Sequence, residues 1–435
     1  MALLISVFSL PATAGEASHE PVADTAESHV LAYRRLRTEA LAAAAAEDLD
    51  TAAARLAEAD ARVSNHPGLI ILRARIATQA GREEEALTQI RRYAAAGLTL
   101  DLTRDRILST LSAATGFPAA VAALNANRAP VGDGQLTEMA RIDGAVIVEA
   151  LVRDEPGGRW LISQVRGRTI IALADDGTVS GFLRGDPAIG GVVGMALDSE
   201  AGLLWAATSP LAPAIHGIDA GDPRPVPALL KIDLATGTVL DRLEPPSSPT
   251  ERSLGDIVRT ADGTIHVADA ATGDILSLPP GGSELGVLVP AGTLGSPQGM
   301  VPTPDGASLI VADYSSGLWR VDRDTGSAQR LSAPVDASLI GVDGLTSDGR
   351  VLYAFQNGVT PQRVLRLTLV EGWTAVSAVE VLAANLPIID EPTTGLVRNG
   401  ELVFVSRSQW SDFNGDGAQT TPMPAPAIIA RLPLD

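Results

Sequence analysis

Four polar residues that lie far apart in the sequence begin similar short motifs, each with a small residue nearby and an aliphatic residue after it. They are Glu149, Asp256, Gln298 and Asp343. Carboxylate and amide oxygens are the ligands that hard cations such as Ca²⁺ and Mg²⁺ prefer, whereas zinc favours nitrogen and sulfur. Three carboxylates gathered in a buried place would repel one another unless a cation or protons compensated their charge. If the fold brings these residues together, they form a candidate divalent-cation site, with Ca²⁺ expected before Mg²⁺.

These motifs belong to a series of six repeating units. The units begin at Glu149-Ala150-Leu151, Val193-Gly194-Met195, Asp256-Ile257-Val258, Gln298-Gly299-Met300, Asp343-Gly344-Leu345 and Thr394-Gly395-Leu396. Their starts are about 42 to about 63 residues apart, which is typical of one four-stranded propeller blade per unit with insertions. Within the units, Asp-Gly turns separate short runs of Val, Ile and Leu, and this pattern predicts β-hairpins.

The repeats therefore predict an all-β six-bladed propeller over residues 141–435. In a propeller the innermost strand of each blade starts beside the central channel, so the six unit starts should converge there. Val193 and Thr394 would then complete the ring, and they are the two members that carry neither a carboxylate nor an amide.

Four stretches carry a resemblance to a known family. They are Glu149 to Pro156, Pro297-Gln298-Gly299-Met300, Val342-Asp343-Gly344-Leu345, and Gln356-Asn357-Gly358 to Arg363-Val364. From about Asp143 to Asp435 the chain resembles the SMP-30/gluconolactonase-like propellers and, more distantly, the paraoxonase-type lactonases. The resemblance implies a divalent-metal-dependent hydrolase of lactones or esters.

The same resemblance implies a role for each of the four polar residues. Glu149, Gln298 and Asp343 would hold the metal, Asp343 would also act as general base, and Asp256 would contact the substrate. A metal in this position would polarise the substrate carbonyl and lower the pKa of a bound water.

The sequence departs from the family pattern at two places. Gln298 stands where the family has Asn, and its additional methylene moves the amide oxygen outward by about one bond length, against a ligand-distance tolerance of about 0.2 Å. Ser253 and Gly255 stand where the sugar-lactone members carry an Arg and an Asn. These departures keep an alternative open, namely a catalytically degenerate propeller that binds a ligand or, together with the preceding helical region, a protein.

Residues 29–129 have a different composition, rich in Ala, Leu, Arg and Glu, which predicts helices. The stretch around Ala46 and Leu56 recurs 34 residues later around Ala80 and Ile90. This period resembles the tetratricopeptide repeat, with a plain helical bundle as the alternative. Such arrays bind extended peptides or pack on a neighbouring domain, so a protein partner is one expectation. The breaker-rich residues 130–140 are predicted to be a linker.

The beginning of the chain predicts export. Ala2 to Leu10 form a short apolar run, and Pro11, Ala12, Thr13 and Ala14 follow as a small-residue cleavage site. We therefore predict a signal peptide over residues 1–14, a linker over residues 15–28, and a periplasmic or secreted protein. The chain contains no Cys, which suits an oxidising compartment and excludes thiolate chemistry.

Charge and hydropathy bear on the expected partners. The formal net charge of −19 disfavours nucleic acid, because the protein surface repels phosphate. After the N-terminal segment no apolar stretch is long enough to insert into a membrane. A lactone or ester remains the expected small-molecule partner.

Two further motifs are interpreted without a catalytic role. The segment Asp412 to Gly417 matches the first half of an EF-hand loop, but the twelfth position is Met423 instead of Glu, so we predict a plain loop. His266 lies in a predicted strand and is interpreted as an ordinary strand residue. No Gly-x-Ser-x-Gly or phosphate-loop motif occurs in the sequence.

Overall fold

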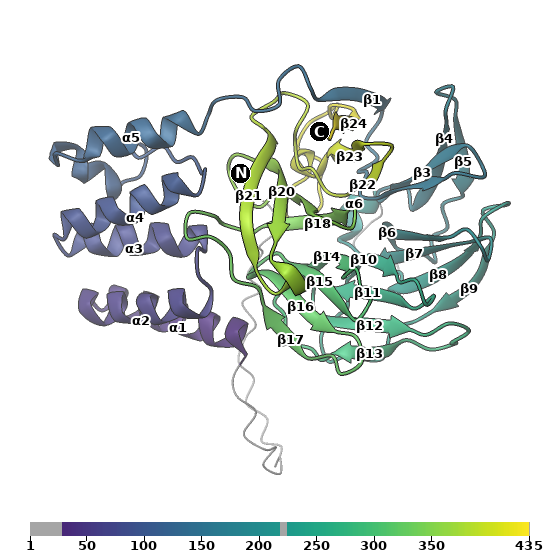
Figure 1. The fold of residues 1–435 in the computed structure, drawn as a ribbon, viewed down its shortest axis with the longest axis horizontal. Coiled ribbons are helices and arrows are strands. Elements are labelled where there is room, and N and C mark those ends of the chain that lie inside the picture. Colours follow the sequence, from purple (N-terminus) through teal and green to yellow (C-terminus); the bar gives the residue numbers. More distant parts are fainter. Residues whose placement is uncertain (1–27, 218–223, 435) are drawn as a thin grey trace, which may run out of the picture.

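The computed structural model describes residues 28–217 and 224–434 of the 435-residue chain. Figure 1 shows a ring of sheets with a stack of helices along one side. The predicted signal peptide lies outside the described residues, as does the predicted linker up to residue 27. Across the described ranges, no helix combines the length and the apolar character needed to cross a membrane.

Six four-stranded antiparallel sheets follow one another along the chain, so the predicted six-bladed propeller is confirmed. Blade 1 contains β2 (Leu151–Asp154), β3 (Arg159–Gln164), β4 (Thr169–Ala174) and β5 (Val179–Leu183). Blade 2 contains β6 (Gly191–Asp198), β7 (Leu203–Ser209), β8 (Ala228–Asp233) and β9 (Val239–Leu243), with the short helix α6 (Pro213–His216) between β7 and β8. Blade 3 contains β10 (Leu254–Arg259), β11 (Ile265–Asp269), β12 (Asp274–Leu278) and β13 (Gly286–Val289).

The remaining blades repeat the arrangement. Blade 4 contains β14 (Pro297–Pro302), β15 (Ser308–Asp313), β16 (Gly317–Asp322) and β17 (Ala328–Arg330). Blade 5 contains β18 (Val342–Ser347), β19 (Leu352–Gln356), β20 (Arg363–Leu369) and β21 (Val376–Ala384), with the turn η2 (Glu371–Trp373) before β21. Blade 6 contains β22 (Gly395–Arg398), β23 (Glu401–Arg407), β24 (Ala427–Pro433) and β1 (Thr137–Ile142), with the turn η3 (Trp410–Asp412) after β23.

Blade 6 closes the ring, because its outer strand comes from the other end of the propeller sequence. β1 pairs with β24 antiparallel, with Thr137 opposite Arg431 and Ile142 opposite Ala427. β1 therefore begins inside residues 130–140, which the sequence analysis assigned to a linker. The proline and the glycines of that segment all lie in its first part, and the strand starts shortly after them.

Apolar faces of neighbouring blades form the core between them. Between blades 1 and 2, for example, Leu161 and Ile170 belong to the same buried cluster as Val192, Leu204 and Leu230, all with no exposed surface. Aliphatic side chains dominate these interfaces, as expected for a chain with only 3% aromatic residues. Burial of this kind supplies the main stabilisation of such a fold.

The helical region contains α1 (His29–Ala45), α2 (Leu49–Arg62), α3 (Pro67–Gln79), α4 (Glu83–Ala95), the turn η1 (Leu108–Ala113) and α5 (Phe117–Ala126). The equivalent helices α2 and α4 begin 34 residues apart, at Leu49 and Glu83. Leu56 and Ile90, which the repeat pattern places in equivalent positions, are both fully buried. The helices are thus as expected, and their membership of the tetratricopeptide class stays a prediction.

Candidate functional site

β-Bulges mark the start of most innermost strands. The strand register shifts between Val192 and Gly194, between Leu254 and Ile257, between Pro297 and Met300, and between Val342 and Gly344. A bulge bends the strand and redirects the side chain of the additional residue. Asp256, Gln298 and Asp343 all fall within these breaks, and Glu149 lies shortly before β2. The structure thus places Asp256, Gln298 and Asp343 at equivalent positions in their blades.

Glycines near these bulges let the inner strands approach one another closely. A Cβ on Gly194 would clash with backbone atoms of Gly255 and Asp256, and one on Gly299 would clash with Leu345. A Cβ on Gly344 would clash with the carbonyl oxygen of Thr393. At these three positions the glycine of the motif is therefore a packing requirement.

Buried carboxylates hold the chain just before two of the site residues. Asp269 accepts a hydrogen bond from the backbone N–H of Ser253 at 3.0 Å, and Asp313 accepts one from Ser296 at 3.1 Å. Both carboxylates are fully buried. Arg252 donates to Asp269 at 2.9 Å and so compensates its charge. These contacts position the entry into β10 and β14, and hence Asp256 and Gln298.

Neutral donors hold two of these carboxylates. The indole Nε1 of Trp410 donates to Oε2 of Glu149, and Nδ2 of Asn357 donates to Oδ2 of Asp343 at 2.7 Å. Gln298 Nε2 donates to Ser296 Oγ at 3.3 Å. The amide oxygen of Asn357, Oδ1, is buried and has no hydrogen-bond partner within the described part of the chain.

The directions of the pKa shifts place three carboxyl groups, those of Glu149, Asp256 and Asp343, within reach of one another's charge. Burial, followed by the charge of Asp343, raises the pKa of Glu149 well above its usual range. Burial and the charge of Asp256 do the same for the pKa of Asp343. Burial raises the pKa of Asp256 to about 7. Groups so far apart in sequence affect one another only because the fold gathers them.

Glu391 is a fourth carboxylate that the sequence analysis missed. Its charge raises the pKa of both Glu149 and Asp343, and its own pKa is raised to about 7, chiefly by burial. Its φ of 53° is unusual for a residue other than glycine, and its backbone N–H donates to Gln362 Oε1 at 2.7 Å. Glu391 lies in the connection between β21 and β22 and begins no unit, so no repeat signal pointed to it.

The donor set fits a hard cation in its chemistry. Glu149, Asp343 and Gln298 supply carboxylate and amide oxygens, and the unpartnered Oδ1 of Asn357 lies on the residue that contacts Asp343. In the parts of the chain that the structure describes, however, no three acidic or histidine side chains come close enough to ligate one ion. Amide oxygens must therefore contribute to any cation site here.

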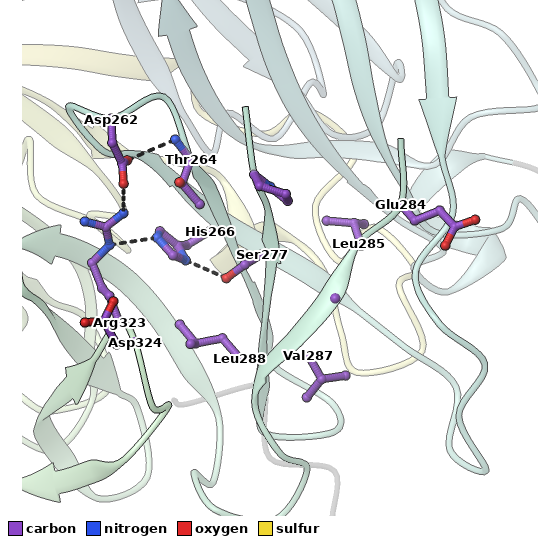
Figure 2. Close-up of a pocket in the computed structure, with 12 residues that line it drawn as sticks. Asp262, Thr264, His266, Ser277, Glu284, Leu285, Val287, Leu288, Arg323 and Asp324 are labelled. Carbon is purple, nitrogen blue, oxygen red and sulfur yellow. Dashed lines mark hydrogen bonds and ion pairs between the residues drawn. The ribbon is translucent and has the colours of Figure 1, made fainter. Parts of the chain in front are cut away.

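A hollow of about 600 Å³ lies between blades 3 and 4, away from these residues. Figure 2 shows His266 between Ser277 and Arg323, with Asp262 beyond the arginine. Arg323 Nε lies 3.2 Å from His266 Nε2. A guanidinium nitrogen donates and cannot accept, so His266 Nε2 is the acceptor. His266 Nδ1 therefore carries the proton and donates to Ser277 Oγ at 2.7 Å. Because the imidazole cannot accept the Ser277 proton in this tautomer, the pair is not an activated nucleophile, which agrees with His266 being an ordinary strand residue.

Several solved structures have a similar fold and match about 70% of this chain. A gluconolactonase from Xanthomonas campestris is 18% identical over 71% of this chain and 93% of its own, with a TM-score of 0.48. Regucalcin from Agrobacterium tumefaciens, a calcium-binding protein, is 16% identical over 68% of this chain and 93% of its own, with a TM-score of 0.47. An aldose sugar dehydrogenase from Streptomyces coelicolor, bound to PQQ, is 15% identical over 69% of this chain and 99% of its own, with a TM-score of 0.46. At these identities the likeness concerns the fold alone. No protein-family model and no curated protein matches the sequence.

Proposed function

We propose that the propeller is a divalent-cation-dependent hydrolase of lactones or esters, with its site at the channel end of the innermost strands. The observation that carries this proposal is the gathering of Glu149, Asp256 and Asp343. Burial and the charges of neighbouring carboxylates raise the pKa of Glu149 and of Asp343, and burial raises the pKa of Asp256. Such an arrangement is unfavourable without compensation and is typical of sites that bind a cation or transfer protons.

Each residue then has a distinct role. Glu149, Gln298 and Asp343 hold the cation, Ca²⁺ before Mg²⁺, with the Asn357 amide oxygen as a further donor. When bound, the cation supplies polarisation of the carbonyl and acidification of water. Asp343, oriented by the hydrogen bond from Asn357, accepts the proton of the attacking water. Asp256 contacts the substrate.

A binding module without turnover is the second candidate. One observation favours it: an oxygen of Glu149 is already engaged by the Trp410 indole. Gln298 in place of Asn points the same way. In this reading the propeller binds a ligand, and the helical region, as a tetratricopeptide-like array, binds a protein. Either function is proposed for a periplasmic or secreted protein.

Metal analysis and turnover of the purified full chain distinguish the two functions. For the hydrolase we expect bound Ca²⁺, a lower melting temperature on adding chelator, and chelator-sensitive opening of some members of a panel of aldonolactones, alkyl lactones and aryl esters. Asp343→Asn should reduce kcat by about 10²- to 10⁴-fold, the usual contribution of a general base. Asp324→Asn, at the hollow between blades 3 and 4, serves as the control and should leave kcat unchanged. Absence of metal together with absence of turnover and of any chelator effect would exclude the hydrolase.

A further inference from the structure

The connection between β19 and β20, residues 357–362, lies between the helical region and the proposed site; we call it the β19–β20 loop. On the site side, Asn357 Nδ2 donates to Asp343 and, at 3.1 Å, to the carbonyl oxygen of Pro392. At the other end of the loop, Gln362 Oε1 accepts the backbone N–H of Glu391. The loop thus contacts the carboxylate of Asp343 and the backbone of Glu391.

The opposite side of the β19–β20 loop is held by the helices. Val359 is buried in the same apolar cluster as Leu98 and Ile90 of the helical region. The backbone N–H of Thr99 donates to the carbonyl oxygen of Thr360 at 2.8 Å. Figure 1 shows the helical stack beside the blade that contains β20 and β21. The loop is therefore part of the interface between the two domains.

Arg363, the first residue of β20, connects the two sides. Its side chain is 3% exposed, and no carboxylate in the described residues forms an ion pair with it. Instead Nη1 donates to the carbonyl oxygen of Ala96 at 3.0 Å, and Nε donates to Gln356 Oε1 at 2.6 Å. Ala96 is the C-terminal cap of α4, so the negative end of the helix dipole compensates the buried charge.

The hydrogen bonds continue from Arg363 toward Asp343. Gln356 Nε2 donates to the carbonyl oxygens of Ser338 and Ile340, at 2.9 and 2.7 Å. Those two residues lie directly before β18, which contains Asp343. On the helical side, a Cβ on Gly97 would lie only 2.7 Å from Arg363 Nη1, so the close approach of the guanidinium to the end of α4 requires a glycine there.

We propose that Arg363 is a positioning residue that couples the helical region to the channel site, so that docking of the helices orders the β19–β20 loop and, through Asn357, the Asp343 carboxylate. The catalytic part of this inference rests on the proposed function. The structural part, namely that the helical region supports the β19–β20 loop, is independent of the proposed function. A buried guanidinium satisfied only by carbonyl and amide oxygens is costly unless its whole hydrogen-bond set is kept.

Hydrogen–deuterium exchange of the full chain tests the structural part without any substrate. Arg363→Met keeps much of the side-chain volume but removes the donors, and we expect exchange in residues 357–362 to become at least about tenfold faster, as for the loss of hydrogen bonds to a charged group. Arg330→Met is the matched control. Arg330 also joins the two domains, by donating to the carbonyl oxygen of Ser64 at 3.1 Å, but it does not contact the loop. Its replacement should affect exchange near Ser64 and leave residues 357–362 unchanged.

Kinetics test the catalytic part. If a lactone is turned over, Arg363→Met should lower kcat about tenfold with KM unchanged, because Asp343 loses its support while Asp256 does not. Arg363→Lys, which keeps the charge and one donor, should recover part of both effects and also serves if the Met variant does not fold. Unchanged exchange in residues 357–362, or an equal increase everywhere, would overturn the coupling even where turnover is found. Faster exchange confined to the loop supports the coupling even where no lactone is hydrolysed.

Discussion

Glu149 and Asp343 each accept a hydrogen bond from a neutral side chain, the Trp410 indole and the Asn357 amide. A neutral donor orients a carboxylate without neutralising it, so the negative charge of the cluster remains available to a cation or a proton. This distinguishes the channel from the ion pair of Arg252 with Asp269 and Asp274, at 2.9 Å, where an arginine compensates the buried carboxylates. This difference supports the proposal that the carboxylates of the site receive positive charge, whereas the Arg252 cluster is already compensated.

Gln298→Asn is the prediction that belongs to the residue scale. Shortening the side chain withdraws the amide oxygen by about one bond length, to the reach expected of a metal ligand. We expect tighter Ca²⁺ binding, measured by isothermal titration calorimetry on chelator-treated protein. Gln329→Asn, a change of the same type in the strand β17, is the control and should leave Ca²⁺ affinity unchanged. Unchanged Ca²⁺ affinity in Gln298→Asn would show that Gln298 is not a ligand, and weaker binding would show that the site fits the longer side chain.

At the scale of the elements, the bulge and the glycine at the start of β14 and of β18 serve one purpose. The bulge redirects the side chain of the polar residue, and the glycine admits the neighbouring strand at a close approach. Asp343 and Gly344 show both features, since the register shifts there and the position after Asp343 has no room for a Cβ. Site geometry and blade packing therefore depend on the same few residues.

Gly344→Ala should accordingly destabilise the propeller. The new methyl group would clash with the backbone of Thr393, and overpacking of this kind costs about 1–3 kcal/mol. Gly181→Ala, in the strand β5, is the matched control, because no atom lies within 4 Å of its Cβ position. Urea denaturation should show a lower midpoint for Gly344→Ala and no loss for Gly181→Ala. Equal midpoints would contradict the close-approach explanation.

On the scale of the whole molecule, buried histidines make stability depend on pH. Burial lowers the pKa of His66, His216 and His266 to about 4 each. Between pH 6.5 and 4 the unfolded chain binds protons that the folded protein does not, so the free energy of unfolding falls as the pH decreases through this window. Asp256 and Glu391, with pKa values raised to about 7, act in the opposite direction, so a variant is needed to isolate the histidines.

His66→Phe provides that isolation. His66 stacks on Tyr33 with ring centroids 5.1 Å apart, and Phe keeps this contact without titrating. Melting temperatures measured from pH 7.5 to 4.5 should decline less steeply for the variant than for the wild type. Parallel curves would mean that His66 does not contribute to the acid sensitivity.

The propeller could be predicted from the sequence because its signals are local and repeated. Asp-Gly turns, short aliphatic strands and six motifs such as Asp343-Gly344-Leu345 each reflect constraints within one blade. The same periodicity identified Glu149, Asp256, Gln298 and Asp343 as residues at equivalent places. The helical region was visible for a similar reason, since α2 and α4 repeat after 34 residues.

Contacts between segments far apart in the chain were decided only by the tertiary structure. The Trp410 indole on Glu149, the entry of Glu391 into the channel cluster, and the contact of Arg363 with the end of α4 join residues that share no motif. The closure of blade 6 by β1 is of the same kind. A repeat determines which residues are equivalent, because its pattern follows from the geometry of a single blade. Which donor each of them meets depends on how the non-repeating connections and the helices pack, and no local pattern encodes that.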